Sequence, residues 1–214
     1  KDGLRNRKWN WWHENGQKKK EVTYKDGKLD GLSTWWFDNG QREFEGTFKD
    51  GKRDGLSTIW YENGQKSQEA TDKDGKLDGL HTFWFENGKK KKEVTYKDGK
   101  LDGLHTFWFE NGKKKKEVTY KDGEEISWKQ WTYFENGQKK TEEIYNKNGK
   151  RDGLQTDWYE NGQKGYEGTY KDGKLDGLYT DWDDNGQKKK ERTFKNGKMI
   201  SSKEWNKDGS VKND

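Results

Sequence analysis

Aromatic and β-branched residues alternate with polar residues in short segments along the whole chain. Residues 32–37 (LSTWWF) represent one kind of segment and residues 20–24 (KEVTY) the other. A period of two and enrichment in these residue types are typical of strands on a pleated, half-buried surface. The pattern predicts two short strands per repeat and no helix beyond a turn.

Glycine-containing dipeptides separate these segments at regular intervals. The glycines of the Asn-Gly series lie at 16, 40, 64, 88, 112, 137, 162, 186 and 209 and are 23 to 25 residues apart. The last of them, Gly209, follows Asp instead of Asn. A second series, Lys-Asp-Gly or Lys-Asn-Gly, falls between them, and residues 76–99 are identical to residues 100–123. Two turns in each unit of 24 residues predict a tandem array of β-hairpins.

The two turns are expected to differ. Asn39-Gly40 suits a two-residue type I′ turn, because Gly and Asn tolerate positive φ. The segment 50–55 (DGKRDG) predicts a longer connection at the opposite end of each hairpin.

Side-chain alternation assigns the residues of each unit to two faces of the sheet. Leu32, Thr34 and Trp36 share one face, which we term the repeated face because the other units carry the same three residue types there. The opposite, variable face changes from unit to unit and is most apolar in the middle of the chain. We expect the repeated face to pack and the variable face to bind a partner. The candidate partner-binding residues on the variable face are Trp35, Phe37, Ile59, Tyr61, His81, Phe83, Phe85, His105, Phe107 and Phe109.

These observations predict an all-β fold, an elongated antiparallel β-hairpin repeat array forming a single twisted sheet of about eight units. The array is expected to occupy residues 1–214 as one domain. Three parts depart from the repeat: an atypical N-terminal unit at 1–16 with an overlong segment 4–12, an irregular unit or kink at 124–137, and a C-terminal capping unit at 198–214.

The unit Asp-Gly-Leu-x-Thr-x-Trp-Tyr/Phe-Glu-Asn-Gly-x4-Glu-x-Thr-Tyr-Lys-Asp-Gly-Lys resembles the MORN repeat in its bacterial variant form. Residues 53–76 and 152–174 carry it nearly whole, and residues 198–209 resemble the unit that often closes such arrays. The resemblance covers essentially the whole chain. It implies a hairpin array that acts in protein scaffolding or binds acidic lipid, and bacterial variants are often labelled antitoxins or immunity-like partners. The family motif contains no catalytic residue to carry over.

Composition narrows the classes of function. Only 25% of the residues are apolar and 15% are aromatic, so a thick aliphatic core of the kind found in most compact enzymes is excluded. Charged residues make up 40% at a net charge of +5, and this mixed surface disfavours nucleic acid as the partner. No apolar run approaches the roughly 20 residues of a transmembrane segment.

Candidate chemical motifs fail on their spacing. The segment 26–31 (DGKLDG) resembles a calcium loop, but Lys28 and Phe37 occupy positions that need oxygen ligands. His81 and His105 occupy equivalent places in successive units, about 9.6 Å apart, which is too far to share a zinc ion. The chain has no cysteine and no nucleophile-base grouping outside the repeat. We therefore expect no cofactor, no metal and no enzymatic activity.

The lysine runs at 18–20, 89–92, 113–116 and 188–190 are interpreted as solvated strand starts that prevent edge pairing. The function that remains is a non-catalytic repeat scaffold that binds another macromolecule, a protein in the favoured case, through the variable aromatic face. The alternatives are a toxin-neutralising partner and a cell-surface glycan-binding module, and acidic lipid headgroups remain a candidate ligand. The protein is expected to be soluble. Because the chain begins inside a repeat, at Lys1, we expect its N-terminus to be truncated, and its compartment is not decided.

Overall fold

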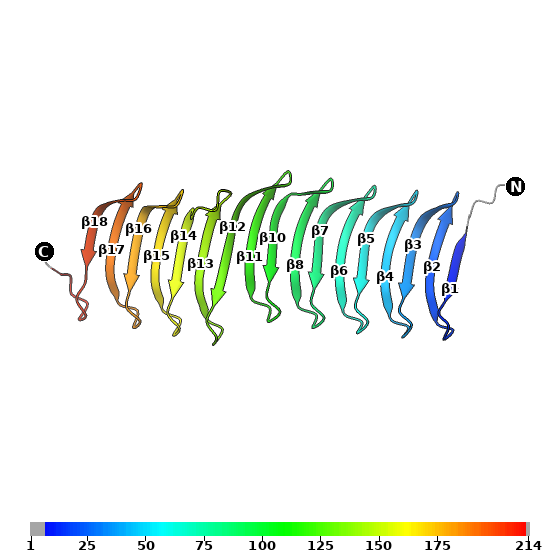
Figure 1. Ribbon diagram of the computed structural model, residues 1–214, viewed down its shortest axis with the longest axis horizontal. Coiled ribbons are helices and arrows are strands. Elements are labelled where there is room, and N and C mark those ends of the chain that lie inside the picture. Colours follow the sequence, from blue (N-terminus) through cyan, green and yellow to red (C-terminus); the bar gives the residue numbers. More distant parts are fainter. Residues whose placement is uncertain (1–6, 213–214) are drawn as a thin grey trace. The chain divides into compact units, whose positions relative to one another are not determined.

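The computed structural model describes residues 7–212. These residues form eighteen strands and no helix (Figure 1). Consecutive strands are joined as antiparallel hairpins, except that Lys100–Leu101 and Gly103–Trp108 both pair with Lys90–Lys97. The predicted all-β class and hairpin repeat are confirmed. Strand formation follows from the alternation of side chains along each segment and from the absence of proline, which would remove ladder hydrogen bonds.

The chain divides into two compact parts, which are called the first and second unit from here on, whereas each 24-residue element is called a repeat. The first comprises Lys1–Lys113 and Tyr120–Glu124, and the second Lys114–Thr119 and Glu125–Asp214. The strands that start in the first unit's Lys1–Lys113 segment are β1 (Lys8–Trp12), β2 (Lys18–Lys25), β3 (Lys28–Trp36), β4 (Arg42–Lys49), β5 (Lys52–Trp60), β6 (Lys66–Lys73), β7 (Lys76–Trp84), β8 (Lys90–Lys97), β9 (Lys100–Leu101) and β10 (Gly103–Trp108). The remaining strands are β11 (Lys114–Lys121), β12 (Glu124–Tyr133), β13 (Lys139–Asn146), β14 (Gly153–Trp158), β15 (Lys164–Lys171), β16 (Lys174–Trp182), β17 (Lys188–Lys195) and β18 (Lys198–Glu204).

The turn types are the reverse of those predicted. Asp26 and Gly27 both have positive φ, 48° and 78°, and join β2 to β3 as a two-residue turn. At the opposite end of the hairpins, Gly40 has a φ of 83° and its amide donates to the carbonyl of Phe37 at 3.0 Å. Asn39 is not at positive φ, so this is a three-residue loop that ends in a left-handed glycine. The longer connection expected at 50–55 is absent, because β5 begins at Lys52.

The asparagine of the Asn-Gly loop does not adopt the positive φ predicted for it. Its side chain makes two hydrogen bonds instead. Asn63 Oδ1 accepts from the amide of Gln65 at 2.9 Å, within the loop. Its Nδ2 donates to the carbonyl of Glu86 in the next loop at 3.0 Å. Equivalent links between loops start from Asn15, Asn39, Asn87, Asn136 and Asn161. Successive hairpins are therefore tied together at their loops as well as along their strands.

The three atypical segments have these structures. Residues 4–6 of the overlong N-terminal segment lie outside the described residues, and the remainder forms β1, which pairs with β2. In the middle segment, β12 has ten residues and pairs with β13 with a register shift at Thr132/Tyr133. Near the C-terminus, β18 pairs with β17, and a bridge between Trp205 and Val211 follows.

Candidate binding surface

The centre line of the variable face contains the most buried positions of the sheet. Val22 on β2 lies directly opposite Ser33 on β3, and their exposed fractions are 0% and 1%. Gln155 on β14 is 1% exposed. Larger side chains two positions away on the same strands, such as Tyr24 and Trp35, rise above this line. The variable face is thus a floor of buried side chains with larger aromatic side chains beside it.

The repeated face is only partly a packing face. Six of its threonines are 4–7% exposed, at 34, 58, 82, 106, 156 and 180. Its six leucines are 46–55% exposed, at 32, 56, 80, 104, 154 and 178. The prediction that these leucines pack is wrong. Within each unit the described strands form a single layer, so the leucines have no second layer to pack against.

Lysine and arginine side chains, and not the leucines, cover the tryptophans of the repeated face. Lys18 Nζ lies 2.6 Å from Glu21 and 5.6 Å from the ring centre of Trp36 in the next strand pair. The same lysine or arginine, glutamate and tryptophan recur in the other repeats, with cations at 42, 66, 90, 114, 139, 164 and 188. Each exposed pair is worth at most about 1 kcal/mol. The repetition nevertheless leaves the charges of this face paired.

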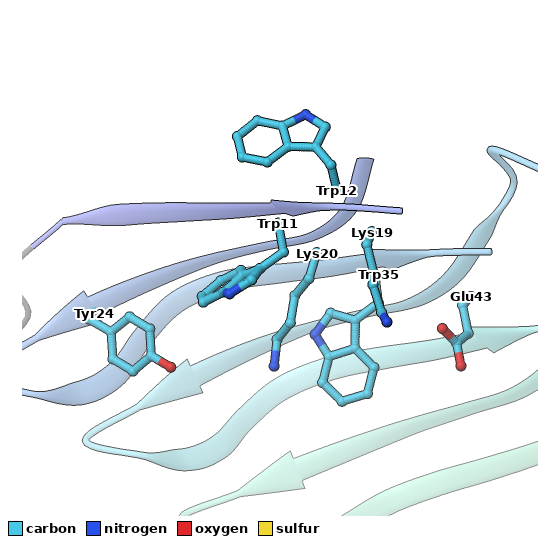
Figure 2. A pocket seen from close by; sticks show the side chains of 7 residues that line it. All are labelled: Trp11, Trp12, Lys19, Lys20, Tyr24, Trp35 and Glu43. Carbon is cyan, nitrogen blue, oxygen red and sulfur yellow. The ribbon is translucent and has the colours of Figure 1, made fainter. Parts of the chain in front are cut away.

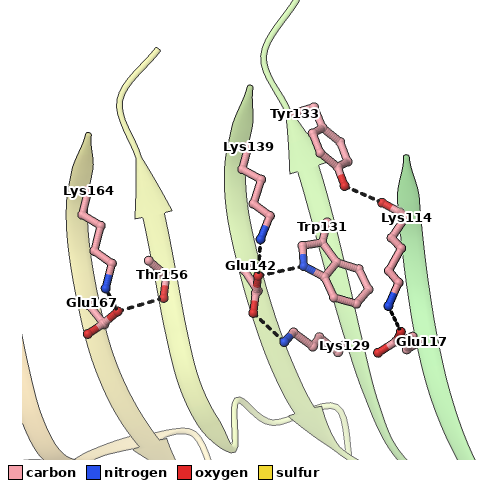
Figure 3. Close-up of polar contacts among 10 residues, drawn as sticks. All are labelled: Lys114, Glu117, Lys129, Trp131, Tyr133, Lys139, Glu142, Thr156, Lys164 and Glu167. Atoms are coloured by element: carbon pink, nitrogen blue, oxygen red, sulfur yellow. Dashed lines mark hydrogen bonds and ion pairs between the residues drawn. The ribbon is translucent and has the colours of Figure 1, made fainter. Parts of the chain in front are cut away.

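The densest of these clusters lies in the second unit, around Glu142 on β13 (Figure 3). Its carboxylate accepts from Lys129 at 2.5 Å, from Lys139 at 3.0 Å and from Trp131 Nε1 at 2.8 Å. Burial alone would raise the pKa of Glu142, but these three donors outweigh it and lower the pKa to about 2. In the irregular segment, Trp131 occupies the strand position that a buried threonine occupies in other repeats, and the cluster forms around it.

The ten predicted partner-binding residues differ in accessibility. His105 is 2% exposed, with Nε2 at 3.1 Å from the carbonyl of Thr95, so it is part of the buried floor and cannot itself meet a partner. Phe109 is 36% exposed. The other eight are half-buried. His81 and Phe83 are brought together, with ring centres 4.0 Å apart.

Four of the ten, Phe37, Tyr61, Phe85 and Phe109, lie where the Asn-Gly loops begin. The amide of Phe37 donates to the carbonyl of Gln41 across the loop at 2.9 Å. The hydroxyl of Tyr61 donates to the carbonyl of Trp84 in the next repeat at 2.7 Å. Tyr61 therefore joins the start of its loop to the end of β7 in the next repeat, a role that alternation along one strand could not reveal.

Sequence reasoning missed the lysines that lie among the aromatics of the variable face. Lys20 Nζ lies 5.8 Å from the ring centre of Trp11 and 4.6 Å from that of Trp35. An open cavity of about 540 Å³ adjoins them and is also lined by Trp12, Lys19, Tyr24 and Glu43. Figure 2 shows Trp11, Lys20, Tyr24 and Trp35 on one side of the strands and Trp12 on the other. The sequence could have revealed this lysine, because Lys20 lies two residues from the apolar Val22 and therefore on the same face of the strand.

A second such lysine lies in the middle of the first unit. Lys92 on β8 is the cross-strand partner of both Phe83 and Phe107, and its Nζ lies 4.1 Å from the ring centre of Phe83. Burial, followed by the neighbouring charge of Lys91, lowers the pKa of Lys92. The variable face of this unit therefore offers aromatic rings with cations held against them.

The variable face of the second unit is more polar and more internally paired. Arg151 donates to Glu143 at 2.6 Å, and the hydroxyl of Tyr179 donates to Asp181 at 2.7 Å. Burial raises the pKa of Tyr179 and that of Asp157. Arg151 and Glu143, and likewise Tyr179 and Asp181, therefore satisfy one another.

Among residues 7–212, no group of three or more His, Asp or Glu side chains is placed to hold a metal ion. Nor does this part of the chain contain a helix long and apolar enough to cross a membrane.

Comparison with known families gives one match. The family described as MORN repeat variant matches seven segments, at residues 8–26, 29–50, 53–71, 77–98, 101–122, 151–172 and 175–196. No curated protein matches the chain.

Proposed function

Because the chain belongs to the MORN repeat variant family, a non-enzymatic scaffold type, we propose that it is a non-catalytic scaffold that binds another protein through the variable face of its first unit. The observation that carries the proposal is the row of half-buried aromatics with lysines held against them, Trp11, Lys20 and Trp35 at one end and Phe83 and Lys92 further along. Aromatic and cationic groups of this kind are enriched among the residues that dominate protein interfaces.

The contrast between the two faces supports this choice of surface. On the repeated face, cation-glutamate pairs lie over the tryptophans at 36, 60, 84, 108, 131, 158, 182 and 205, so these charges are already paired. Apart from the identical repeats 76–99 and 100–123, the variable face differs from repeat to repeat, which is consistent with a surface adapted to one partner. Its centre is buried, and this supports preorganised side chains above it.

A double substitution tests the surface. Phe83→Asp with Phe107→Asp should abolish capture of the partner from a lysate of the source cells. Both new carboxylates would face Lys92, the cross-strand partner of both positions, and Asp already occupies the equivalent positions 157 and 181. We therefore expect the melting temperature to stay within a few degrees of the wild type.

The matched control places the same charges on the opposite face of the same strands. Leu80→Asp with Leu104→Asp changes side chains that are 49% and 51% exposed and should leave capture intact. Equal capture by the wild type and both variants would refute the proposed surface. Loss of capture only in the leucine variant would mean that the partner binds the repeated face.

A glycan-binding surface is the second candidate, favoured by the open cavity beside Trp11 and Trp35. Sugar rings stack on such indole faces, and Lys19 and Glu43 line the same cavity and could hydrogen-bond hydroxyl groups. Binding on a glycan array that is lost with Trp35→Ala and kept with Phe83→Asp would support this candidate against the protein partner.

A further inference from the structure

One repeat of the first unit departs from its neighbour along a single strand. On β6 the residues Gln68, Ala70 and Asp72 face the same way as Lys92, Val94 and Tyr96 do 24 residues later on β8. A short acidic side chain thus replaces an aromatic ring. The structure has a cavity of about 130 Å³ at this place. Its lining includes Arg53, Ser57, Gln68, Asp72, Leu77 and His81.

Asp72 is a buried carboxylate without a paired cation. The residue is 6% exposed, and its hydrogen-bond donor is the hydroxyl of Ser57, at 3.5 Å. No cationic nitrogen of the described residues lies within 4.0 Å of it. Burial of an unpaired carboxylate is costly, so such a group is a strong acceptor for any cation that can reach it.

His81 adds a second unused acceptor. Its Nε2 lies 3.3 Å from Gln68 Oε1, an acceptor, so this nitrogen carries the hydrogen and Nδ1 presents a lone pair. Nδ1 is buried and has no hydrogen-bond partner. The ring is fixed by stacking on Phe83 at 4.0 Å. A carboxylate and an imidazole that line one small cavity are complementary to a guest that donates hydrogen bonds and carries positive charge.

We propose that this cavity receives the ammonium or guanidinium group of a lysine or arginine side chain from the protein bound on the variable face. This inference rests on the proposed function and names the chemistry of one anchoring residue of the partner. The cavity has room for such a head group, and Ile59 and Leu77 line it with apolar atoms for the aliphatic stem.

Arg53 makes it possible to test whether the group bound in the cavity is a cation or an anion. It lines the cavity, and its guanidinium is held over the ring of Phe44 at 5.5 Å from the ring centre. Its positive charge opposes a cationic guest. Removing it by Arg53→Ala should therefore strengthen binding of a cation, whereas it would weaken binding of an anion.

The experiment follows the histidine ring signals by two-dimensional NMR during titration with Nα-acetyl-lysine methylamide and with Nα-acetyl-arginine methylamide. The chain has three histidines, so the signals of His81, His105 and His13 can be assigned by substitution. His105 is the matched control, because it occupies the same position in the next repeat but stacks on Tyr120 at 4.4 Å. We expect a saturable shift at His81 and none at His105 or His13.

Two variants connect the shift to the cavity. Asp72→Asn keeps the shape and removes the charge, and should weaken binding of both probes by about tenfold or more. The triple substitution Gln68→Lys, Ala70→Val and Asp72→Tyr installs the sequence that already packs in the next repeat. It should fill the cavity and abolish the shift while the protein stays folded.

Three results would overturn the inference. One is an equal shift with the uncharged probe Nα-acetyl-norleucine methylamide, and another is unchanged binding in Asp72→Asn. The third is an Asp72-dependent shift with Mg²⁺ at lower concentration than with the amines, which would make the cavity a metal site. If the probes fail while Phe83→Asp with Phe107→Asp still abolishes capture, this inference fails alone. If the probes bind and that capture test fails, the cavity stands without the proposed function.

Discussion

At the residue scale, the side chains that matter most are those whose contacts come from another repeat. Trp36 lies under Lys18 and Tyr61 reaches the carbonyl of Trp84, and neither contact is visible in the alternation of a single strand. The sequence was sufficient to place residues on the two faces. It was not sufficient to tell which face buries its side chains, because that depends on cations of neighbouring strands covering the tryptophans.

Glu142 gives a prediction for the pH dependence of stability. Its pKa is lowered from an ordinary value of 4.5 to about 2, so its stabilising contribution is complete above pH 4.5 and is lost as the pH falls toward 2. Glu142→Gln should lower the free energy of unfolding at pH 7 by about 1–3 kcal/mol, because it breaks the ion pairs to Lys129 and Lys139. It should also flatten the loss of stability between pH 4.5 and 2.

Chemical denaturation across this pH range measures both effects. Glu167→Gln is the matched control, since Glu167 accepts from one lysine, Lys164, at 2.5 Å and from Thr156 at 3.4 Å. Its effect should be smaller than that of Glu142→Gln. A steep acid dependence that persists in Glu142→Gln would show that other carboxylates govern it.

At the element scale, the hairpin was predictable but its turn chemistry was not. The dipeptides Asn-Gly and Lys-Asp-Gly marked both ends of each hairpin correctly, because glycine at positive φ is a local requirement. The type I′ turn formed at Asp26-Gly27 and not at Asn39-Gly40. The asparagine is used for its amide, which bridges to the next loop, and a property that spans two repeats cannot be inferred from the φ preference of one residue.

The bridging amide can be tested one hydrogen bond at a time. Asn63→Ala removes both the bond from the amide of Gln65 and the bond to the carbonyl of Glu86, and should cost about 1–2 kcal/mol. Asn63→Asp keeps the acceptor and loses only the donor, and should cost about half as much. Asp208 shows that aspartate fits this loop position, since its Oδ1 accepts from the amide of Ser210 at 2.9 Å. If Asn63→Asp causes no loss in thermal or chemical denaturation, the bridge to Glu86 contributes nothing, whereas equal losses in both variants would mean that the bond within the loop contributes nothing.

At the scale of the whole molecule, the repeat predicts how stability is distributed. Strands such as β3 pair with β2 on one side and β4 on the other, so each repeat is supported chiefly by its neighbours. The period of about 24 residues made this organisation predictable from the sequence. The cavity at Asp72 was less so, because it becomes apparent only when β6 is compared with β8 at matched positions of the folded sheet.

Trp84 provides the test of neighbour-limited stability. Its ring lies under Lys66 at 5.7 Å from the ring centre, and its carbonyl accepts from Tyr61. Trp84→Ala removes a large half-buried side chain, so we expect a local cost of about 2–4 kcal/mol, somewhat below that of a fully buried tryptophan. Amide hydrogen exchange should show lost protection from β5 to β8. Protection in β14 to β17 should be unchanged, because the substitution alters no contact of those strands. A uniform loss of protection in all strands would instead mean that the repeats unfold as one cooperative block.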